Sequence, residues 1–249
     1  MRTSKKWMVL SVITALVLVF SAFSTTVKAA TKEAPAVPVT FTILHTNDFH
    51  GQLVASGSNP GLARTAAAIN AVRTTVGADK TLVVDAGDEM QGSLLSNLYH
   101  GESTIGSFNA VPYDLATFGN HEFDWGQDVL AERTTQATYP FVSANIVVND
   151  TGNCATAGWT TPAFIDGGPY TIKTVGTAPN TVKVAFIGVT TTEVPVITVA
   201  TATAGLCFKD PQAAILKYYD EVKAQADVIV VLSHLGYNDG GYGYGVPVI

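Results

Sequence analysis

Six side chains that can bind a metal ion stand directly after apolar segments with the composition of β-strands. In chain order they are Asp48, His50, Asp88, Asn120, His121 and His234. Mixed carboxylate, imidazole and amide ligands suit Zn, Mn, Fe or Co better than Ca or Mg. In layered α/β folds, the loops at the carboxyl ends of the strands converge on one crevice. The sequence therefore predicts that these six side chains meet at one edge of a sheet.

Each of these signals has an ordinary alternative when it is taken alone. An aspartate such as Asp48 often caps a turn, and Gly-Asp is common turn chemistry. A histidine after a buried strand, such as His234, is often a hydrogen-bonded core residue. The joint pattern is more informative, because D-x-H, G-D, G-N-H-E and S-H occur in this order, each at the end of a predicted strand. This order favours a metal centre over four unrelated loops.

The segments that must position these side chains alternate between strand and helix patterns. Strands are predicted over 39–45, 81–84, 113–118, 182–189 and 227–232, with the last expected to be buried. Helices are predicted over 62–76 and from Asp210-Pro211 onward, where an N-cap precedes a proline in the first turn. Continuously apolar strands between helices predict an α/β layered domain whose helices cover a sheet. The Gly-, Thr- and Pro-rich segment 149–179 is interpreted as a surface excursion or a hairpin.

Four short motifs resemble those of a known family. They are Asn47-Asp48-Phe49-His50-Gly51, Asp85-Ala86-Gly87-Asp88, Gly119-Asn120-His121-Glu122-Phe123-Asp124 and Ser233-His234-Leu235-Gly236. In type and order they look like the motifs of the calcineurin-like metallophosphoesterases, and the first and third resemble the 5'-nucleotidase branch in particular. The resemblance implies a layered α/β fold in which central mixed β-sheets form a β-sandwich flanked by helices.

The resemblance also implies two divalent metal ions that share one carboxylate. Asp48 and His50 would bind the first ion, Asn120 and His234 would bind the second, and Asp88 would bridge both. An anionic bridge is needed because two dications about 3.5–4 Å apart repel each other. The ions would be Zn, Mn, Fe or Co, and the sequence leaves this choice open.

A catalytic pair follows the third motif in the same interpretation. The resemblance gives His121 a role at the phosphate or the leaving group, and Asp124 would accept a hydrogen bond from His121 and favour its protonated form. Without the resemblance, His121 could equally be a structural residue. Other polar residues are left out of the site: His45 is expected to be packed or to lie behind the ligands, His100 to be solvated, and Asp85 to support the Gly-Asp loop through hydrogen bonds.

The implied activity is hydrolysis of nucleotide phosphate esters, of the 5'-nucleotidase, nucleotide-sugar hydrolase or 2',3'-cyclic-nucleotide phosphodiesterase type. One alternative is a non-catalytic remnant that binds metal or phosphate, and the intact set of ligands argues against it. A second is a phosphoprotein phosphatase, which shares G-N-H-E but not the N-D-F-H-G form. The substrate would be a small nucleotide. The sequence indicates neither the base, the sugar, the ester type nor the oligomeric state.

The sequence departs from the family pattern after His234. Family members carry a Gly-His-x-His or Gly-His-x-Gln motif a few tens of residues later and then a domain that recognises the nucleoside, and neither occurs before Ile249. Residues 39–249 are therefore interpreted as a catalytic domain that is incomplete at its C-terminus. We expect this chain alone to bind metal weakly and to be weakly active or inactive.

The N-terminus has the pattern of an export signal. A basic start is followed by an apolar stretch from Trp7 to about Phe23 and by small residues up to Ala29. Residues 1–29 are predicted to be a signal peptide and 30–38 a tether; the alternative is a retained membrane anchor. Cleavage would give a protein that is secreted, periplasmic or at the cell surface, with no stable membrane partner.

The cysteine count, the composition and the net charge add three further constraints. Cys154 and Cys207 are the two cysteines of the chain, and in an oxidising compartment they predict one disulfide, with two separate thiols as the alternative. Hydrophobic residues make up 47% of the chain, which is enough to bury a core. The net charge of -6 gives no basic surface for a nucleic-acid polymer.

Overall fold

The computed structural model describes residues 38–236. The signal peptide predicted over 1–29, the tether predicted over 30–38 except for its last residue, and the segment 237–249 lie outside the described residues. Within the described part, no helix is both long enough and apolar enough to cross a membrane.

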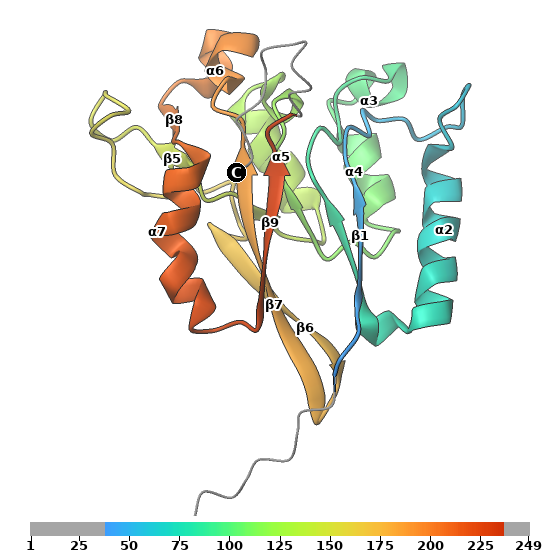
Figure 1. Cartoon of the computed structure of the whole chain (residues 1–249). Helices are drawn as coiled ribbons and strands as arrows, with labels where there is room; N and C mark the ends of the chain where they lie inside the picture. The colour runs from blue at the N-terminus through green and yellow to red at the C-terminus, as the bar shows by residue number, and fades with distance from the viewer. Residues whose placement is uncertain (1–37, 237–249) are drawn as a thin grey trace, which may run out of the picture. The chain divides into compact units, whose positions relative to one another are not determined.

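The first half of the described chain builds a parallel sheet with helical crossovers. Its strands, in spatial order, are β1 (Thr42–Thr46), β2 (Thr81–Asp85), β3 (Leu115–Thr117) and β4 (Phe141–Val142). The connecting helices are α2 (Gly61–Val76), η1 (Ala78–Lys80), α3 (Leu94–Leu98), α4 (Glu102–Phe108), η2 (His121–Phe123) and α5 (Gln127–Gln136). Parallel pairing requires such crossovers, and it brings the carboxyl ends of the four strands to one edge of the sheet (Figure 1).

The second half builds a mixed sheet and a short ribbon. The sheet contains β6 (Tyr170–Thr177), β7 (Asn180–Thr190) and β9 (Val228–His234), with β6 antiparallel and β9 parallel to the central β7. The ribbon pairs β5 (Ile146–Val148) with β8 (Leu206–Phe208). The helices of this half are α6 (Val194–Ile197), η3 (Ala200–Thr203) and α7 (Pro211–Lys223).

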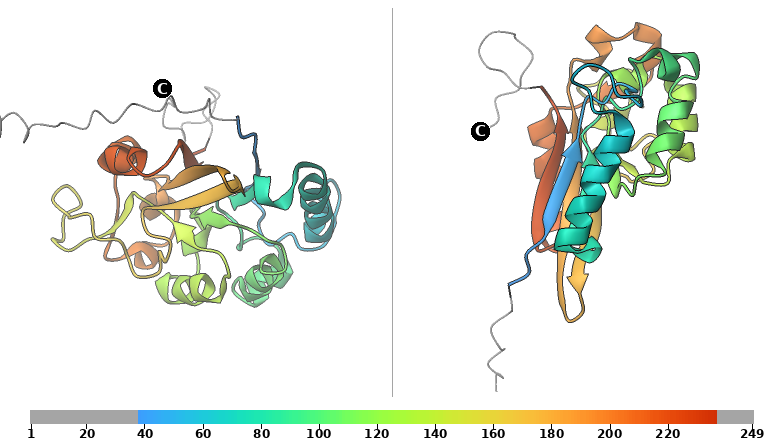
Figure 2. Two further views of the ribbon diagram at one scale, coloured as in Figure 1. Left: turned by 90° about the horizontal axis from the view of Figure 1, so that it is seen from below. Right: turned by 90° about the vertical axis from the view of Figure 1, so that its right-hand side faces the viewer.

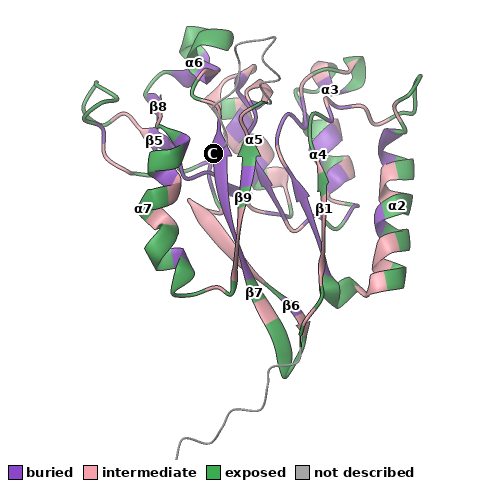
Figure 3. Ribbon diagram, viewed as in Figure 1, coloured by how far each residue is buried: buried purple, intermediate pink, exposed green. Residues whose placement is uncertain are grey.

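The two sheets pack face to face, and helices cover their outer faces. Leu82, Val84 and Leu115 of the first sheet share one buried cluster with Val184, Phe186 and Leu232 of the second. The next residues of β7, Ala185 and Ile187, point the other way and pack on α7. Helices α2, α4 and α5 cover the far face of the first sheet. Figures 2 and 3 show these layers and the buried strands between them, and the predicted β-sandwich flanked by helices is confirmed.

Most predicted elements are present, with differences at their ends. The helix predicted over 62–76 is α2, and Asp210 caps α7 as expected, because its Oδ1 accepts from the backbone N–H of Ala213 at 2.7 Å. The strand predicted over 113–118 is shorter, at Leu115–Thr117. In the segment 149–179, the excursion ends at Tyr170, and β6 then forms a hairpin with β7.

Two burial predictions are wrong for the same reason. The sequence predicts that strand β9 is buried, yet Val231 is 41% exposed. It also predicts that His45 is packed, yet this side chain is exposed on β1. Among the described strands, β9 and β1 are edge strands of their sheets. Each of them is therefore hydrogen-bonded to a neighbouring strand on one side alone. Apolar composition identifies a strand but does not tell an edge strand from a central one.

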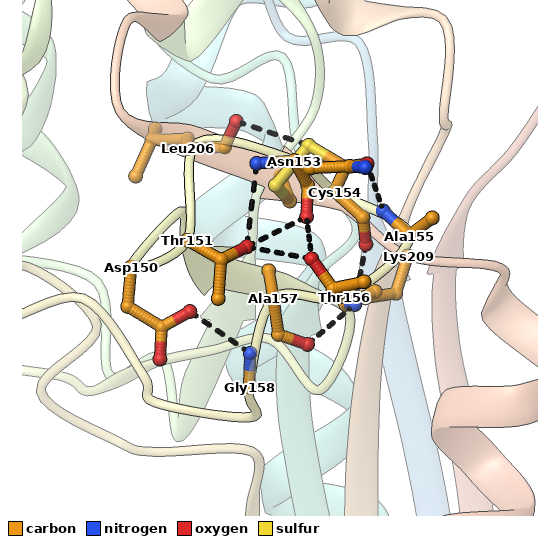
Figure 4. Close-up of a disulfide and its surroundings, with 11 residues drawn as sticks. Asp150, Thr151, Asn153, Cys154, Ala155, Thr156, Ala157, Gly158, Leu206 and Lys209 are labelled. Carbon is orange, nitrogen blue, oxygen red and sulfur yellow. Dashed lines mark hydrogen bonds between the residues drawn. A yellow bond between two sulfur atoms is a disulfide. The ribbon is translucent and has the colours of Figure 1, made fainter.

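The predicted disulfide between Cys154 and Cys207 is confirmed (Figure 4). It closes a loop across a sequence separation of 53 residues and ties the excursion after β5 to strand β8. Lys209 adds to this attachment, since its Nζ donates to the carbonyl oxygens of Cys154 and Ala157 at 2.7 and 2.8 Å. The arm formed by the excursion is therefore fixed to the body of the domain.

Candidate metal centre

Five of the predicted site residues lie in the loops that follow three strands of the first sheet. Asp48 and His50 follow β1, Asp88 follows β2, and Asn120 and His121 follow β3. His234 is the last residue of β9 in the second sheet. All four strands point toward the same end of the domain (Figure 1). The fold therefore brings the predicted residues to one end of the domain, at the carboxyl ends of strands from both sheets.

Backbone hydrogen bonds continue the pairing of β1 and β2 beyond the strands and fix the first two loops to each other. The N–H groups of Asp48, His50 and Gly51 donate to the carbonyl oxygens of Gly87, Asp88 and Glu89 at 2.9, 2.9 and 2.8 Å. The two loops therefore form one rigid unit, and the side chains of Asp48, His50 and Asp88 are carried on it.

Three predicted ligands adopt backbone conformations that side chains other than glycine seldom adopt. Asp48, His50 and Asp88 have φ angles of 51°, 51° and 59°. The left-handed conformation costs roughly 1–2 kcal/mol per residue. Such residues cluster at functional sites, where the surrounding structure holds them in place. The strain thus falls on three of the residues that the sequence motifs single out.

Glycines allow the second and third loops to come into contact. A Cβ atom on Gly119 would lie 2.1 Å from Asp88 Oδ1, and a Cβ on Gly87 would lie 2.3 Å from the backbone nitrogen of Gly119. Both distances are far below van der Waals contact. The glycines of the G-D and G-N-H-E motifs are therefore required by this close approach.

The ligand atoms form two groups that share Asp88. One group contains His50, Asp88 and His121, and the other contains Asp48, Asp88 and His234, with the ligand atoms of each group within 4.8 Å of one another. Asp88 Oδ2 lies 3.3 Å from His234 Nε2 and 4.0 Å from His50 Nε2. Ligands that bind one ion at about 2.0–2.2 Å lie about 3–4 Å from each other. Asp48 falls in the group of His234, not in that of His50 as the motifs predict, but its Oδ1 also lies 3.9 Å from His50 Nε2. These separations fit divalent metal ions bound around Asp88.

The orientation of the histidine rings supports the same fit. His50 Nδ1 lies 2.7 Å from the carbonyl oxygen of Gln91, and His234 Nδ1 lies 2.8 Å from that of Ala86. Histidines that bind metals usually donate their other ring N–H to a carbonyl or a carboxylate. Both rings therefore present Nε2 to Asp88 as an available ligand atom.

The charges at the centre depend on one another. Burial opposes ionisation of Asp88, but the hydrogen bond and charge of His234 outweigh it and hold the pKa of Asp88 below its usual range. Burial likewise opposes protonation of His234, but Asp88 raises the pKa of its imidazole to about 9. In the metal-free protein, His234 is therefore the counter-ion of Asp88, and a divalent cation would take over that role.

His121 lies beside this centre and is held by Asp124. His121 Nδ1 is 2.6 Å from Asp124 Oδ2, and its ring makes an edge contact with that of His50 at 5.1 Å. Burial lowers the pKa of His121, but Asp124 and Asp88 outweigh burial and raise it. The predicted hydrogen bond to Asp124 is confirmed. His121 is also close enough to His50 and Asp88 to be a ligand, a role that the sequence motifs do not predict.

Asn120 and His234 both line one small hollow. The hollow has a volume of about 280 Å³ and is lined by Asn120, Thr191, Glu193, Ile197, His234, Leu235 and Gly236. The predicted role of Asn120 and His234 at one ion stays a prediction.

Glu122 is a structural residue of the centre that sequence reasoning missed. Its side chain is 1% exposed and accepts three backbone N–H groups, those of Asp88, Glu89 and Gly119, at 2.7–2.8 Å. One carboxylate thus connects the second loop to the third. The signal was present in the sequence, because Glu122 belongs to the G-N-H-E motif.

Asp85 supports the site as expected. Its Oδ1 accepts from the N–H of Gly87 at 2.8 Å, and its Oδ2 accepts from the hydroxyl of Thr46. Burial raises the pKa of Asp85 to about 8. Burial also raises the pKa of Glu89, the residue that follows Asp88, well above its usual value.

Comparisons with known proteins agree with this geometry. Residues 41–249 match the model of the calcineurin-like phosphoesterase family. A snake venom 5'-nucleotidase from Naja atra is 31% identical over 79% of this chain and 36% of its own length. A 2',3'-cyclic-nucleotide 2'-phosphodiesterase/3'-nucleotidase from Salmonella typhimurium is 28% identical over 83% of this chain and 33% of its own length.

A solved structure gives the same result. The 5'-nucleotidase precursor from Thermus thermophilus is 31% identical, has a TM-score of 0.62, and is matched over 80% of this chain and 38% of its own. The chain therefore belongs to the calcineurin-like phosphoesterase family and resembles its 5'-nucleotidases. It spans about a third of the length of the curated relatives it matches.

The role of Glu122 can be tested with Glu122→Gln. The amide places N–H donors where a carboxylate oxygen now accepts, so at least one of three backbone N–H groups loses its acceptor. Each buried unsatisfied donor costs about 1–3 kcal/mol. We expect the free energy of unfolding in urea to fall by that amount and metal affinity to fall with it. Glu132→Gln, at a side chain that is 68% exposed, is the control. Wild-type metal affinity in Glu122→Gln would contradict this role.

Proposed function

We propose that this protein is an exported metal-dependent phosphoesterase that hydrolyses nucleotide phosphate esters with two divalent ions held around Asp88. The observation that carries the proposal is the position of Asp88 Oδ2 between His50 and His234, at 4.0 and 3.3 Å from their Nε2 atoms. A carboxylate oxygen shared by two sets of ligands is what a pair of closely spaced cations requires. In this proposal Asp48 and His50 complete one site, and Asn120 and His234 complete the other.

In this proposal the residues of the centre have different roles in hydrolysis. Bound divalent ions of this kind stabilise charge on phosphoryl oxygens and lower the pKa of water. Asp48 and Asp88 supply the negative charge that holds them. The raised pKa of His121 favours its protonated form, from which it can donate a proton to the leaving oxygen as the ester bond breaks. Asp124 fixes the orientation of the ring through Nδ1, so the other ring nitrogen is free to face the substrate.

The substrate class rests on the relatives. Their names give nucleotides and cyclic nucleotides as substrates, and we propose small nucleotides for this protein too. Two hollows among the described residues adjoin the centre and offer space to a substrate. One of about 540 Å³ is lined in part by Asp48 and His234, and one of about 280 Å³ is lined in part by Asn120 and His234. The base, the ester type and the choice among Zn, Mn, Fe and Co are left to experiment.

The location of the protein is part of the proposal. Residues 1–29 would be a signal peptide, 30–38 a tether and 39–249 the catalytic domain, which places the mature protein outside the cytoplasm. The disulfide between Cys154 and Cys207 supports this location, because disulfides persist in oxidising compartments. N-terminal sequencing of the mature protein tests it, since a chain that begins at Met1 would contradict export by cleavage.

Asp88→Ala tests the shared carboxylate in the natural protein. With Mn or Zn added, we expect the wild type to release phosphate from a nucleoside monophosphate and not from a phosphoserine peptide. Asp88→Ala should retain neither ion by elemental analysis and lose nearly all activity, because the cations lose their common anion. Asp128→Ala, at an exposed position of α5, is the control.

The outcomes of this experiment separate the alternatives. Preference for the phosphopeptide would favour a phosphoprotein phosphatase. Metal binding by the wild type without turnover of any ester would favour a non-catalytic binding protein. Two ions retained in Asp88→Ala would contradict the shared carboxylate itself.

His121→Ala tests the catalytic role of the second histidine. Loss of a general acid slows turnover by roughly 100- to 10,000-fold, while metal content should stay at the wild-type level. Asp124→Asn should give a smaller loss in the same direction. His100→Ala, which removes an exposed histidine, is the control. If His121→Ala instead loses an ion, His121 is a ligand, as its distance to His50 and Asp88 permits.

A further inference from the structure

A buried hydrogen-bonded link runs from the second sheet to the loop that carries Asn120. Thr190, the last residue of β7, is fully buried, and its Oγ1 donates to the carbonyl oxygen of Phe118 at 2.7 Å. Phe118 directly follows β3 of the first sheet and directly precedes Gly119-Asn120. One hydroxyl from the second sheet therefore holds the chain at the base of this loop.

Thr190 is itself fixed by a buried amide. Asn145 Oδ1 accepts from the N–H of Thr190 at 2.9 Å, and Asn145 Nδ2 donates to the carbonyl oxygen of Thr190 at 2.7 Å. The side chain thus pairs with both backbone groups of Thr190, as a neighbouring strand would. The same Nδ2 donates to the carbonyl oxygen of Lys209 at 3.0 Å. Asn145 is fully buried, and a buried polar side chain is normally hydrogen-bonded. These three hydrogen bonds meet that requirement.

Close backbone packing brings Thr190 within reach of Phe118. A Cβ atom on Gly188, two residues earlier in β7, would lie 2.2 Å from the carbonyl oxygen of Val142 and 2.8 Å from Thr117 Oγ1. Gly188 places no side chain of its own between the sheets at this point. A short side chain from β7 can therefore reach the backbone of the first sheet, next to the metal centre.

We propose that Asn145 and Thr190 are positioning residues that hold the 119–121 loop, and with it Asn120, in place from the second sheet. In the proposed function, on which this inference rests, Asn120 and His234 bind the same ion. His234 lies on β9, which pairs with β7 so that Thr190 and His234 are in register. The link thus ties the loop of one ligand to the strand that carries the other. Loss of the link should weaken the second ion and spare the ion held by Asp48 and His50.

The test uses Thr190→Val, which keeps the shape of the side chain and removes its hydroxyl. Thr117→Val is the matched control, since Thr117 is equally buried and its Oγ1 donates to the carbonyl oxygen of Val142 at 2.9 Å within the first sheet. Thr190→Ser restores the hydroxyl and should restore the wild-type result. If Thr190→Val does not fold, Thr190→Ala gives the same comparison with a smaller side chain.

Amide hydrogen exchange of the metal-free protein is measured first, because it needs neither metal nor activity. The N–H groups of Gly119 and His121 donate to Glu122 Oε2 and Asp88 Oδ1 at 2.7 and 2.9 Å and should be protected in the wild type. In Thr190→Val we expect both to exchange about tenfold faster, the loss of one buried hydrogen bond. The N–H of His50, which donates to the carbonyl oxygen of Asp88, should keep its wild-type rate. Unchanged exchange at Gly119 and His121, or an equal change in Thr117→Val, would overturn the proposal.

Metal titration of the natural protein is measured second. We expect Thr190→Val to bind one of the two ions about tenfold less tightly and the other as the wild type does. Equal weakening of both ions would show general destabilisation and overturn the positioning role. A wild type that binds fewer than two ions would reject the proposed function, while the exchange experiment would still decide the role of Thr190.

Discussion

The carboxylate of Glu122 accepts the backbone N–H groups of Asp88, Glu89 and Gly119, and the metal centre depends on this contact. It joins the loop after β2 to the loop after β3, and the absence of a side chain on Gly119 leaves room for Asp88 at this contact. Asp88 is thereby kept in a left-handed backbone conformation with its Oδ1 bonded to the N–H of His121. Its Oδ2 is left facing His50 and His234. A buried acid that binds no metal in this account thus determines where the shared ligand points.

The architecture explains why such a contact is possible. Parallel strands deliver their loops to one edge, and the sandwich brings a strand of the second sheet to the same edge with His234 at its end. Each sheet is buried on one face by the other sheet and on the opposite face by helices, so the strand ends have little freedom to move. The residues of the centre come from loops, but the loops are short and fixed to one another by hydrogen bonds.

Much of this could be predicted from the sequence. Alternating strand and helix patterns predicted the layered fold, and residues at strand ends predicted where Asp48, His50, Asp88 and His234 meet. Burial against specific neighbours could not be predicted in this way. Exposure of Val231 on β9 depends on which strand lies beside it, and the roles of Asn145 and Thr190 depend on contacts between segments far apart in the chain. Glu122 was visible within a motif, but only the geometry gives its function.

The central claim is that Asp88 is shared by two metal ions. Crystals of the natural protein grown with Mn, with anomalous scattering recorded at the Mn edge, test it most directly. Two anomalous peaks about 3.5–4 Å apart, one near Asp48 and His50 and the other near Asn120 and His234 with Asp88 between them, are the predicted result. A single peak at Asp88, or peaks that do not touch Asp88, would contradict the account.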